Sequence, residues 1–320
     1  MGTGAPYPRL VGDIGGTHAR FGWVQDAASG ITEVDASVGA DRAGLDAAVA
    51  SYLSAHGLAR PRSCALGIAA PVSGDTVAMT NRDWTFSIGD MQRRLGLGRL
   101  LVINDYAALA HALGDVRPDE VRRVGGGEAV EHGPLALLGP GTGLGVSGLL
   151  VAPGGRVPVV GEGGHVSLSA GDDTEDRVVA ILRRRFGHVS AERALSGPGL
   201  VNLYAASCEL GKRVEEPLAP AEISARARLG SDVDCRRAVD LFFGFLGSVA
   251  GDLALTLGAR GGVYIAGGIV AQLGDIAAST FRERFEAKGR YRAYLARIPT
   301  AVIVDASALA LRGANIALDE

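Results

Sequence analysis

Cysteine, the residue behind disulfide frameworks and many zinc sites, is scarce in this chain. Its 320 residues include three cysteines, Cys64, Cys208 and Cys235, which stand far apart in the sequence. Three scattered thiols cannot build a disulfide framework, and their spacing is not that of a four-ligand zinc site. We therefore expect buried or idle thiols in a reducing compartment and no bound zinc.

A large excess of one charge is also missing. The formal net charge is −3, which gives no electrostatic basis for binding nucleic acid. The opening residues MGTGAPYPRL contain no apolar core, unlike a signal peptide. The longest apolar stretch, Leu241–Leu257, is too short for a membrane span and contains Asp252, so it predicts a core helix. These absences indicate a cytoplasmic protein that binds neither nucleic acid nor membrane.

Glycine, by contrast, is abundant. The chain has 47 glycines, above the usual share of about 7%, and many form short clusters. Clustered glycines predict tight turns, or backbone that approaches a ligand or another segment closely. A chain of this length predicts about two domains.

Short apolar runs that end in glycine or Asn-Asp alternate with longer helical patterns, which indicates an α/β fold. The predicted strands are 9–14, 19–24, 64–69, 100–103, 135–138, 146–151, 263–265 and 301–304, and the predicted helices are 44–56, 174–186, 235–257, 281–288 and 306–318. In helix 235–257 an apolar residue recurs at every fourth position from Leu241. Gly244, Gly247 and Gly251 weaken this helix, so we expect another backbone to pack close against it.

Two segments follow the same plan. LVGDIGGTHARFGWV (10–24) and LALLGPGTGLGVSGLLV (135–151) each join an apolar strand, a glycine turn with a threonine, and a second apolar strand. This similarity predicts a duplicated lobe with a glycine turn on each side. Chance similarity is the alternative, because glycine turns between strands are common.

The two glycine turns are candidate phosphate sites, because successive backbone N–H groups in such a turn form a concave anion site. Asp13, just before the first turn, is placed to hold a water of a phosphate-bound magnesium. Neither turn is a Walker loop or a Rossmann fingerprint, since no Gly-Lys-Ser/Thr follows and a strand rather than a helix comes next. A single turn fits a plain hairpin as well, but the pair favours a polyphosphate. The candidate residues are Gly15, Gly16 and Thr17 in the first turn, and Gly139, Gly141, Thr142, Gly143 and Gly145 in the second.

Polar residues at strand ends form a second group. Asn104 and Asp105 directly follow the strand 100–103, and ligands of open α/β sheets lie at the carboxyl ends of strands. Helix capping is the alternative for Asp105. Glu162, His165 and Glu192 stand in or near other glycine turns. Carboxylates, an amide and an imidazole suit a neutral polyhydroxylated ligand, whereas zinc on His165 lacks a second His or Cys at ligand spacing.

Several motifs occur in the order found in one known family: VGDIGGTHAR, PVSGDTVAMTNRDW, INDYAALA, GPGTGLGV, GEGGHV, GHVSAERALSGPGLVNLY and GGVYIAGGI. From Leu10 to about Asn315 the chain resembles the bacterial glucokinases of the hexokinase–actin–Hsp70 superfamily. It is similar to the non-repressor branch, because it has neither the cysteine-rich zinc motif of the repressor branch nor a DNA-binding extension.

This resemblance implies a two-lobed actin-like ATPase (ribonuclease H-like) fold, with a mixed sheet in each lobe and a central cleft. The small lobe would comprise residues 1–108 plus 301–320, which include a returning C-terminal helix, and the large lobe residues 109–300. The implied activity is ATP-dependent phosphorylation of glucose to glucose 6-phosphate, the first step of glycolysis, with Mg²⁺ carried by ATP, in a homodimer.

The resemblance also assigns roles to residues. It implies that Asp105 is the catalytic base, that Asn104, Glu162, His165 and Glu192 contact glucose hydroxyls, and that Asp13–Thr17 and Gly139–Gly145 bind phosphates. It places the adenosine side at Gly267 and Gly268. Two positions depart from the family pattern, His18 in place of Asn and Pro140 in place of Ala, and neither removes a group that the mechanism needs. A kinase for another hexose or for N-acetylmannosamine, and a sugar-sensing protein without turnover, are the alternatives.

Overall fold

The computed structural model describes residues 4–15, 19–37, 44–79, 84–152 and 155–320, with the backbone alone at 37 and 272–277. The chain divides into two compact units. Unit 1 comprises Met1–Val116 with Asp305–Glu320, and unit 2 comprises Arg117–Val304.

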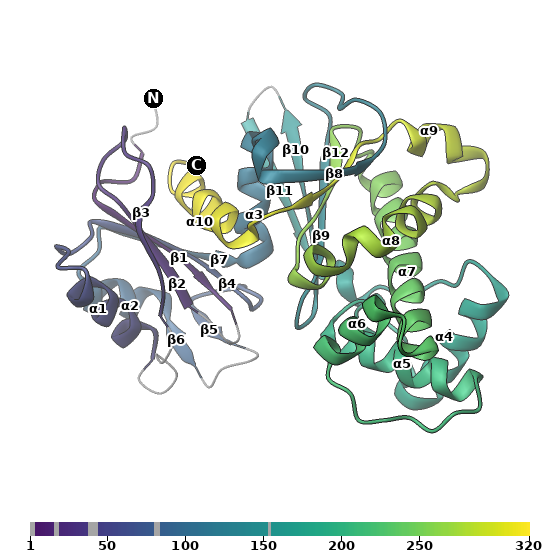
Figure 1. Cartoon of the computed structure of the whole chain (residues 1–320). Helices are drawn as coiled ribbons and strands as arrows, with labels where there is room; N and C mark the ends of the chain where they lie inside the picture. Colours follow the sequence, from purple (N-terminus) through teal and green to yellow (C-terminus); the bar gives the residue numbers. More distant parts are fainter. Residues whose placement is uncertain (1–3, 16–18, 38–43, 80–83, 153–154) are drawn as a thin grey trace. The chain divides into compact units, whose positions relative to one another are not determined.

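Unit 1 is built on a five-stranded sheet of order β3-β2-β1-β4-β7. β1 is antiparallel to β2 and parallel to β4, which is in turn parallel to β7. α1 and α2 cover one face of the sheet, and α3 and α10 the other (Figure 1). The elements are β1 (Arg9–Ile14), β2 (Ala19–Val24), β3 (Thr32–Ser37), α1 (Leu45–Ala55), β4 (Ser63–Ile68), β5 (Thr76–Ala78), β6 (Thr85–Ser87), α2 (Ile88–Leu95), β7 (Arg99–Asn104), α3 (Asp105–Ala112) and α10 (Ala306–Ala317).

Alternation along the strands gives this sheet its two cores. Leu10 and Ile14 of β1 join the core under α1 and α2, whereas Val11 joins the core under α3 and α10. Side chains on successive strand residues point to opposite faces, so a continuously apolar strand predicts a sheet that is covered on both sides.

The last helix, α10, belongs to unit 1 although the whole of unit 2 precedes it in the sequence. It packs closely on α3, because a Cβ at Gly313 would collide with the carbonyl oxygen of Ala108. The buried Arg9 at the start of β1 donates to Asn315 Oδ1 (3.1 Å) and to Asp319 Oδ2 (2.9 Å). The first strand and the end of the chain therefore hold each other in place.

Unit 2 repeats this sheet. Its strand order is β11-β10-β9-β12-β13-β8, with β10 antiparallel to both β11 and β9, and with β9, β12 and β13 parallel. Its first five strands thus have the order and directions of the unit 1 sheet. The segments 10–24 and 135–151 become the equivalent hairpins β1-β2 and β9-β10, so the predicted duplication and the mixed sheet in each unit are confirmed. The strands are β8 (Val121–Gly125), β9 (Leu135–Pro140), β10 (Leu144–Ala152), β11 (Gly155–Gly161), β12 (Gly262–Ile265) and β13 (Thr300–Ile303).

The helices of unit 2 gather around α7. They are α4 (Asp173–Phe186), α5 (Gly197–Leu210), α6 (Pro220–Leu229), α7 (Val233–Leu257), α8 (Gly268–Glu286) and α9 (Arg292–Ala296). α8 begins at Gly268, directly after Gly267, so the prediction of a helix only from Phe281 onward was too short.

α7 begins at Val233, where the Asp232 carboxylate accepts from the N–H groups of Asp234 and Cys235, and ends at the left-handed Gly258. Among the described helices, α7 alone is long and apolar enough for a membrane span. The prediction that its apolar stretch is too short was therefore wrong, but most of that stretch is buried inside unit 2, which identifies a core helix. Its glycines allow α8 to pack close against it, because a Cβ at Gly251 would lie 2.6 Å from the Phe285 carbonyl oxygen. The predicted close backbone contact is thus confirmed.

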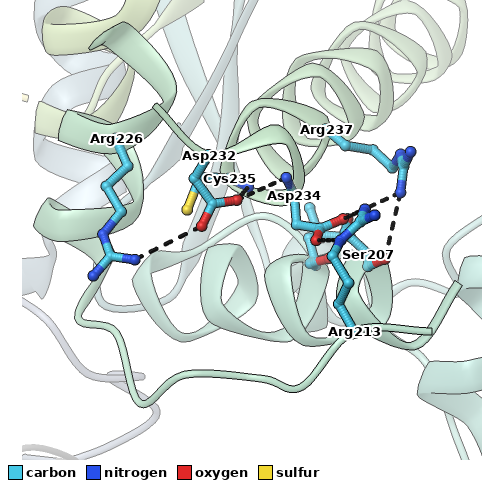
Figure 2. Close-up of polar contacts among 8 residues, drawn as sticks. Ser207, Arg213, Arg226, Asp232, Asp234, Cys235 and Arg237 are labelled. Carbon is cyan, nitrogen blue, oxygen red and sulfur yellow. Dashed lines mark hydrogen bonds and ion pairs between the residues drawn. The ribbon is translucent and has the colours of Figure 1, made fainter. Parts of the chain in front are cut away.

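Ion pairs fix the start of α7 to its neighbours (Figure 2). The buried Asp234 accepts from Arg213 Nη2 at 2.5 Å and from Arg237 Nη1 at 3.2 Å. Arg237 also donates to the backbone of Ser207 in α5, and Arg226 of α6 lies 3.7 Å from Asp232. Because a buried carboxylate needs partners, this network ties α5 and α6 to α7.

Candidate active site

Asn104 and Asp105 lie where β7 passes into α3. The N–H groups of Tyr106 and Ala107 donate to Asn104 Oδ1 at 2.9 and 3.3 Å, so Asn104 is the N-cap. The N-cap role that was the alternative for Asp105 therefore belongs to Asn104. Asp105 is the first residue of the helix and accepts the Tyr106 N–H at 2.9 Å. A helix N-terminus favours negative charge, which suits a carboxylate at this position.

Capping also determines what Asn104 can offer a ligand. Its Oδ1 is already used by two backbone donors, and its Nδ2 donates to the Ala70 carbonyl at 3.4 Å. An amide nitrogen carries two N–H donors, so the side chain can give a hydrogen bond to a sugar oxygen. Asn104 is thus a donor beside the acceptor Asp105.

Asp13 lies at the same edge of the unit 1 sheet. The register pairs Ile14 with Ile68, and Ile68 with Asn104, so the first turn and Asp105 both follow the carboxyl ends of parallel strands. Burial raises the pKa of Asp13 to about 6, although a hydrogen bond with Ser307 and the nearby Arg20 act in the opposite direction. A buried carboxylate of this kind fits a cation, because a positive charge would offset the cost of burial. Gly15 is described, whereas Gly16, Thr17 and His18 lie outside the described residues.

The second turn joins β9 to β10 in unit 2. β9 is buried through Gly139 to its last residue Pro140, and Gly141 and Thr142 are exposed at the tip. Inside the turn the Gly141 N–H donates to the Gly143 carbonyl at 2.8 Å. The Gly197 N–H, at the start of α5, donates to the Gly141 carbonyl at 2.8 Å. The turn is therefore held in shape by the rest of unit 2.

Gly267 and Gly268 follow β12 at the same edge of the unit 2 sheet, since β12 is parallel to β9. Gly267 has φ +109° and lies so close to the Pro140 carbonyl that a Cβ would collide with it. Gly268 is exposed and begins α8, which has no side-chain cap. Because no side chain caps α8, the N–H groups of its first turn suit an anion. Because Gly267 lies against Pro140, the predicted adenosine side and the second phosphate turn are neighbours.

Glu162, His165 and Glu192 come together beside this turn. Glu162 precedes the short helix Gly163–His165, His165 is its last residue, and both side chains are exposed, whereas Glu192 lies in the short helix Ala191–Arg193. The Ala191 N–H donates to the Val166 carbonyl at 2.9 Å, which joins the two segments. Glu192 Oε2 accepts the Leu144 N–H of the second turn at 3.0 Å. The sugar and phosphate candidates of unit 2 therefore form one cluster, whereas Asp13, Asn104 and Asp105 form another in unit 1.

Sequence reasoning missed two residues of these clusters. Ser196 caps α5, accepting the Gly199 N–H and donating to the Glu192 carbonyl, both at 2.9 Å. Its signal was readable, since a serine followed by proline two residues on is a typical helix start. Ser307 of α10 hydrogen-bonds Asp13, a contact between positions too far apart for the sequence to reveal.

Within the described ranges, no group of three or more His, Cys, Asp or Glu residues could hold a metal ion. The three cysteines are free and buried, as expected of idle thiols.

Comparison with solved structures gives the class of protein first. A glucokinase from an Antarctic psychrotroph is 35% identical, with a TM-score of 0.88 over 97% of this chain and 98% of that one. A ROK family glucokinase from Streptomyces griseus, solved with glucose and AMPPNP, shares the fold at 22% identity, with a TM-score of 0.64 over 96% of this chain and 98% of that one. The chain therefore has the fold of a glucokinase.

Sequence comparison then gives the family. The curated glucokinase of Aromatoleum aromaticum is 54% identical over 315 residues, which cover 98% of this chain and 95% of that protein. The family model described as glucokinase matches residues 10–320. The chain belongs to the glucokinase family.

Proposed function

We propose that this member of the glucokinase family transfers the γ-phosphoryl group of ATP to the 6-hydroxyl of glucose in the cytoplasm, as the first step of glycolysis. The observation that carries the proposal is the position of Asp105: a carboxylate at the start of α3, beside a side chain that already caps the helix, at the sheet edge that also carries Asp13. A sensor without turnover would need neither this carboxylate nor two phosphate turns.

The proposed mechanism divides the work between the two clusters. Asp105 accepts the proton of the 6-hydroxyl as that oxygen attacks the γ-phosphorus, and the Asn104 amide donates to a neighbouring sugar oxygen. Glu162, His165 and Glu192 orient the remaining hydroxyls. Exclusion of water from the site protects ATP from wasteful hydrolysis.

The glycine turns and the start of α8 hold the nucleotide. Backbone N–H groups around Gly15–Thr17 and Gly141–Gly143 bind phosphate oxygens, and Gly267 and Gly268 leave room beside the adenosine. Asp13 would hold a water of the Mg²⁺ that ATP carries, and the ion would supply neutralisation of phosphate charge. The ATP-analogue complex of the Streptomyces griseus protein supports ATP as the donor.

A coupled assay with Mg-ATP and a panel of glucose, mannose, galactose and N-acetylmannosamine tests the proposal. We expect glucose to have the highest kcat/KM and no turnover when magnesium is withheld. A clear preference for another sugar would change the substrate, and binding without turnover would make the protein a sensor. We also propose a homodimer of two-lobed subunits, which light scattering of the purified chain tests.

A further inference from the structure

Glu192 lies where the sugar and phosphate candidates of unit 2 meet. Resting on the proposed function, we propose that its carboxylate couples the two sites, so that glucose and nucleotide raise each other's affinity through the second turn. Glu192 would then be a positioning residue for the turn as well as a contact for glucose.

The room for this carboxylate comes from Gly143. A Cβ at position 143 would lie 2.5 Å from Glu192 Oε2 and 3.3 Å from its Cδ. Gly143 is not among the glycines with positive φ, so backbone conformation does not require a glycine there. The missing side chain instead leaves space for Glu192. Gly141, two residues earlier in the same turn, has no atom within 4 Å of its Cβ position.

The segment from Glu192 to Gly197 holds the turn at two points. Glu192 Oε2 accepts the Leu144 N–H at 3.0 Å on one side of the turn tip, and the Gly197 N–H donates to the Gly141 carbonyl at 2.8 Å on the other. Ser196 Oγ donates to the Glu192 carbonyl at 2.9 Å and fixes the backbone between these points. A shift of the Glu192 side chain would therefore change the hydrogen bond that holds the turn at Leu144.

The second carboxylate oxygen is available to a ligand. Within the described part of the chain, Glu192 Oε1 accepts no hydrogen bond, while Oε2 is committed to the turn. A glucose hydroxyl that donates to Oε1 fixes the carboxylate and, through Oε2, the turn. A nucleotide then binds a turn that is already ordered, which gives positive coupling without a large structural change. Such coupling is reciprocal and is commonly about 5- to 150-fold.

Titration calorimetry of the full chain measures the coupling directly. Glucose is titrated with and without saturating Mg-AMPPNP, and the ratio of the two Kd values is the coupling factor. We expect about tenfold for the wild type, within the usual range. Gly143→Ala, which pushes the carboxylate aside, should bring the factor to within about twofold of one, since one charge-assisted contact is lost. The matched control Gly30→Ala adds the same methyl at an exposed glycine outside the candidate sites, where no atom lies within 4 Å of the Cβ position, and should keep the wild-type factor.

The outcomes separate this inference from the proposed function. An undiminished factor in Gly143→Ala, or an equal loss in Gly30→Ala, would overturn the coupling role. If Gly143→Ala does not fold, Glu192→Asp replaces it: its side chain keeps the charge but is one methylene too short to reach Leu144, and it should show the same loss. Wild-type protein that binds both ligands with a factor of one refutes the inference alone. Wild-type protein that binds no glucose refutes the proposed function.

Discussion

Asp105→Asn tests the catalytic base with little disturbance of the fold. The Asn104 side chain, and not Asp105, caps α3, and an asparagine oxygen at position 105 can still accept the Tyr106 N–H. The stability lost is then mainly the favourable interaction of one negative charge with the helix N-terminus, about 0.3–1 kcal/mol. In a chain of this size we expect the Tm to fall by no more than about 4 °C.

The expected loss of activity is far larger. Removal of a general base costs about 10²–10⁴ in rate, which corresponds to about 2.7–5.5 kcal/mol of transition-state stabilisation. We therefore expect kcat to collapse in the coupled assay, while glucose still binds within about tenfold of wild type by calorimetry, a difference of about 1.4 kcal/mol.

Asn104→Ala is the matched control. It removes the acceptor of two backbone N–H groups, so it should cost about 0.5–2 kcal/mol of stability and lower kcat less than Asp105→Asn does. Near-normal turnover in Asp105→Asn would refute the base assignment. A collapse of Tm in that variant would show instead that Asp105 is structural.

Three further predictions concern pH, specificity and packing. Burial raises the pKa of Asp13 to about 6, so the ionised carboxylate destabilises the fold above that pH. Because a bound cation needs the ionised carboxylate, calorimetry should show that Mg-ATP affinity falls as the pH drops below 6. Asp13→Asn should abolish this dependence. In the proposed site the 4-hydroxyl of glucose lies near Asp105, so galactose, which is inverted there, should leave polar groups unpaired and lose at least about 100-fold in kcat/KM. Equal values for glucose and galactose would refute this arrangement. Gly251→Ala should lower the Tm, because the contact with Phe285 in α8 costs about 1–3 kcal/mol against about 1 kcal/mol of gained helicity; an unchanged or higher Tm would contradict the tight packing.

Much of the fold was accessible from the sequence because its strands are continuously apolar and end in glycine. β1 and β2 begin and end where predicted, and the repeated hairpins anticipated the repeated sheet. β3 (TEVDAS) and β11 (GRVPVVG) were missed, since both lie at sheet edges, and β3 is polar while β11 contains a proline. Edge strands need fewer apolar residues, so their sequence signal is weak.

The candidate site was only partly accessible. Strand ends pointed to Asp13, Asn104 and Asp105, but the capping role of Asn104 depends on side-chain geometry that a sequence does not contain. The contact between Glu192 and Leu144 spans 48 positions, and it arises from the pairing of two short segments rather than from any local pattern. Such tertiary contacts decide which glycines make room for a ligand and which make room for a neighbouring side chain.

The return of α10 to unit 1 sets an order of assembly during synthesis. Unit 2 is one continuous segment, so it can fold as soon as it has left the ribosome, as domains generally do. The first residues of unit 1 are synthesised first, but its folding is completed last. Val11 and Ala108 belong to a core that also contains Leu311, and Arg9 hydrogen-bonds Asp319. Until α10 has been synthesised, unit 1, which holds Asp105, exposes an apolar face of its sheet. A nascent chain of this protein is therefore most open to aggregation and to chaperone binding through the residues it made earliest.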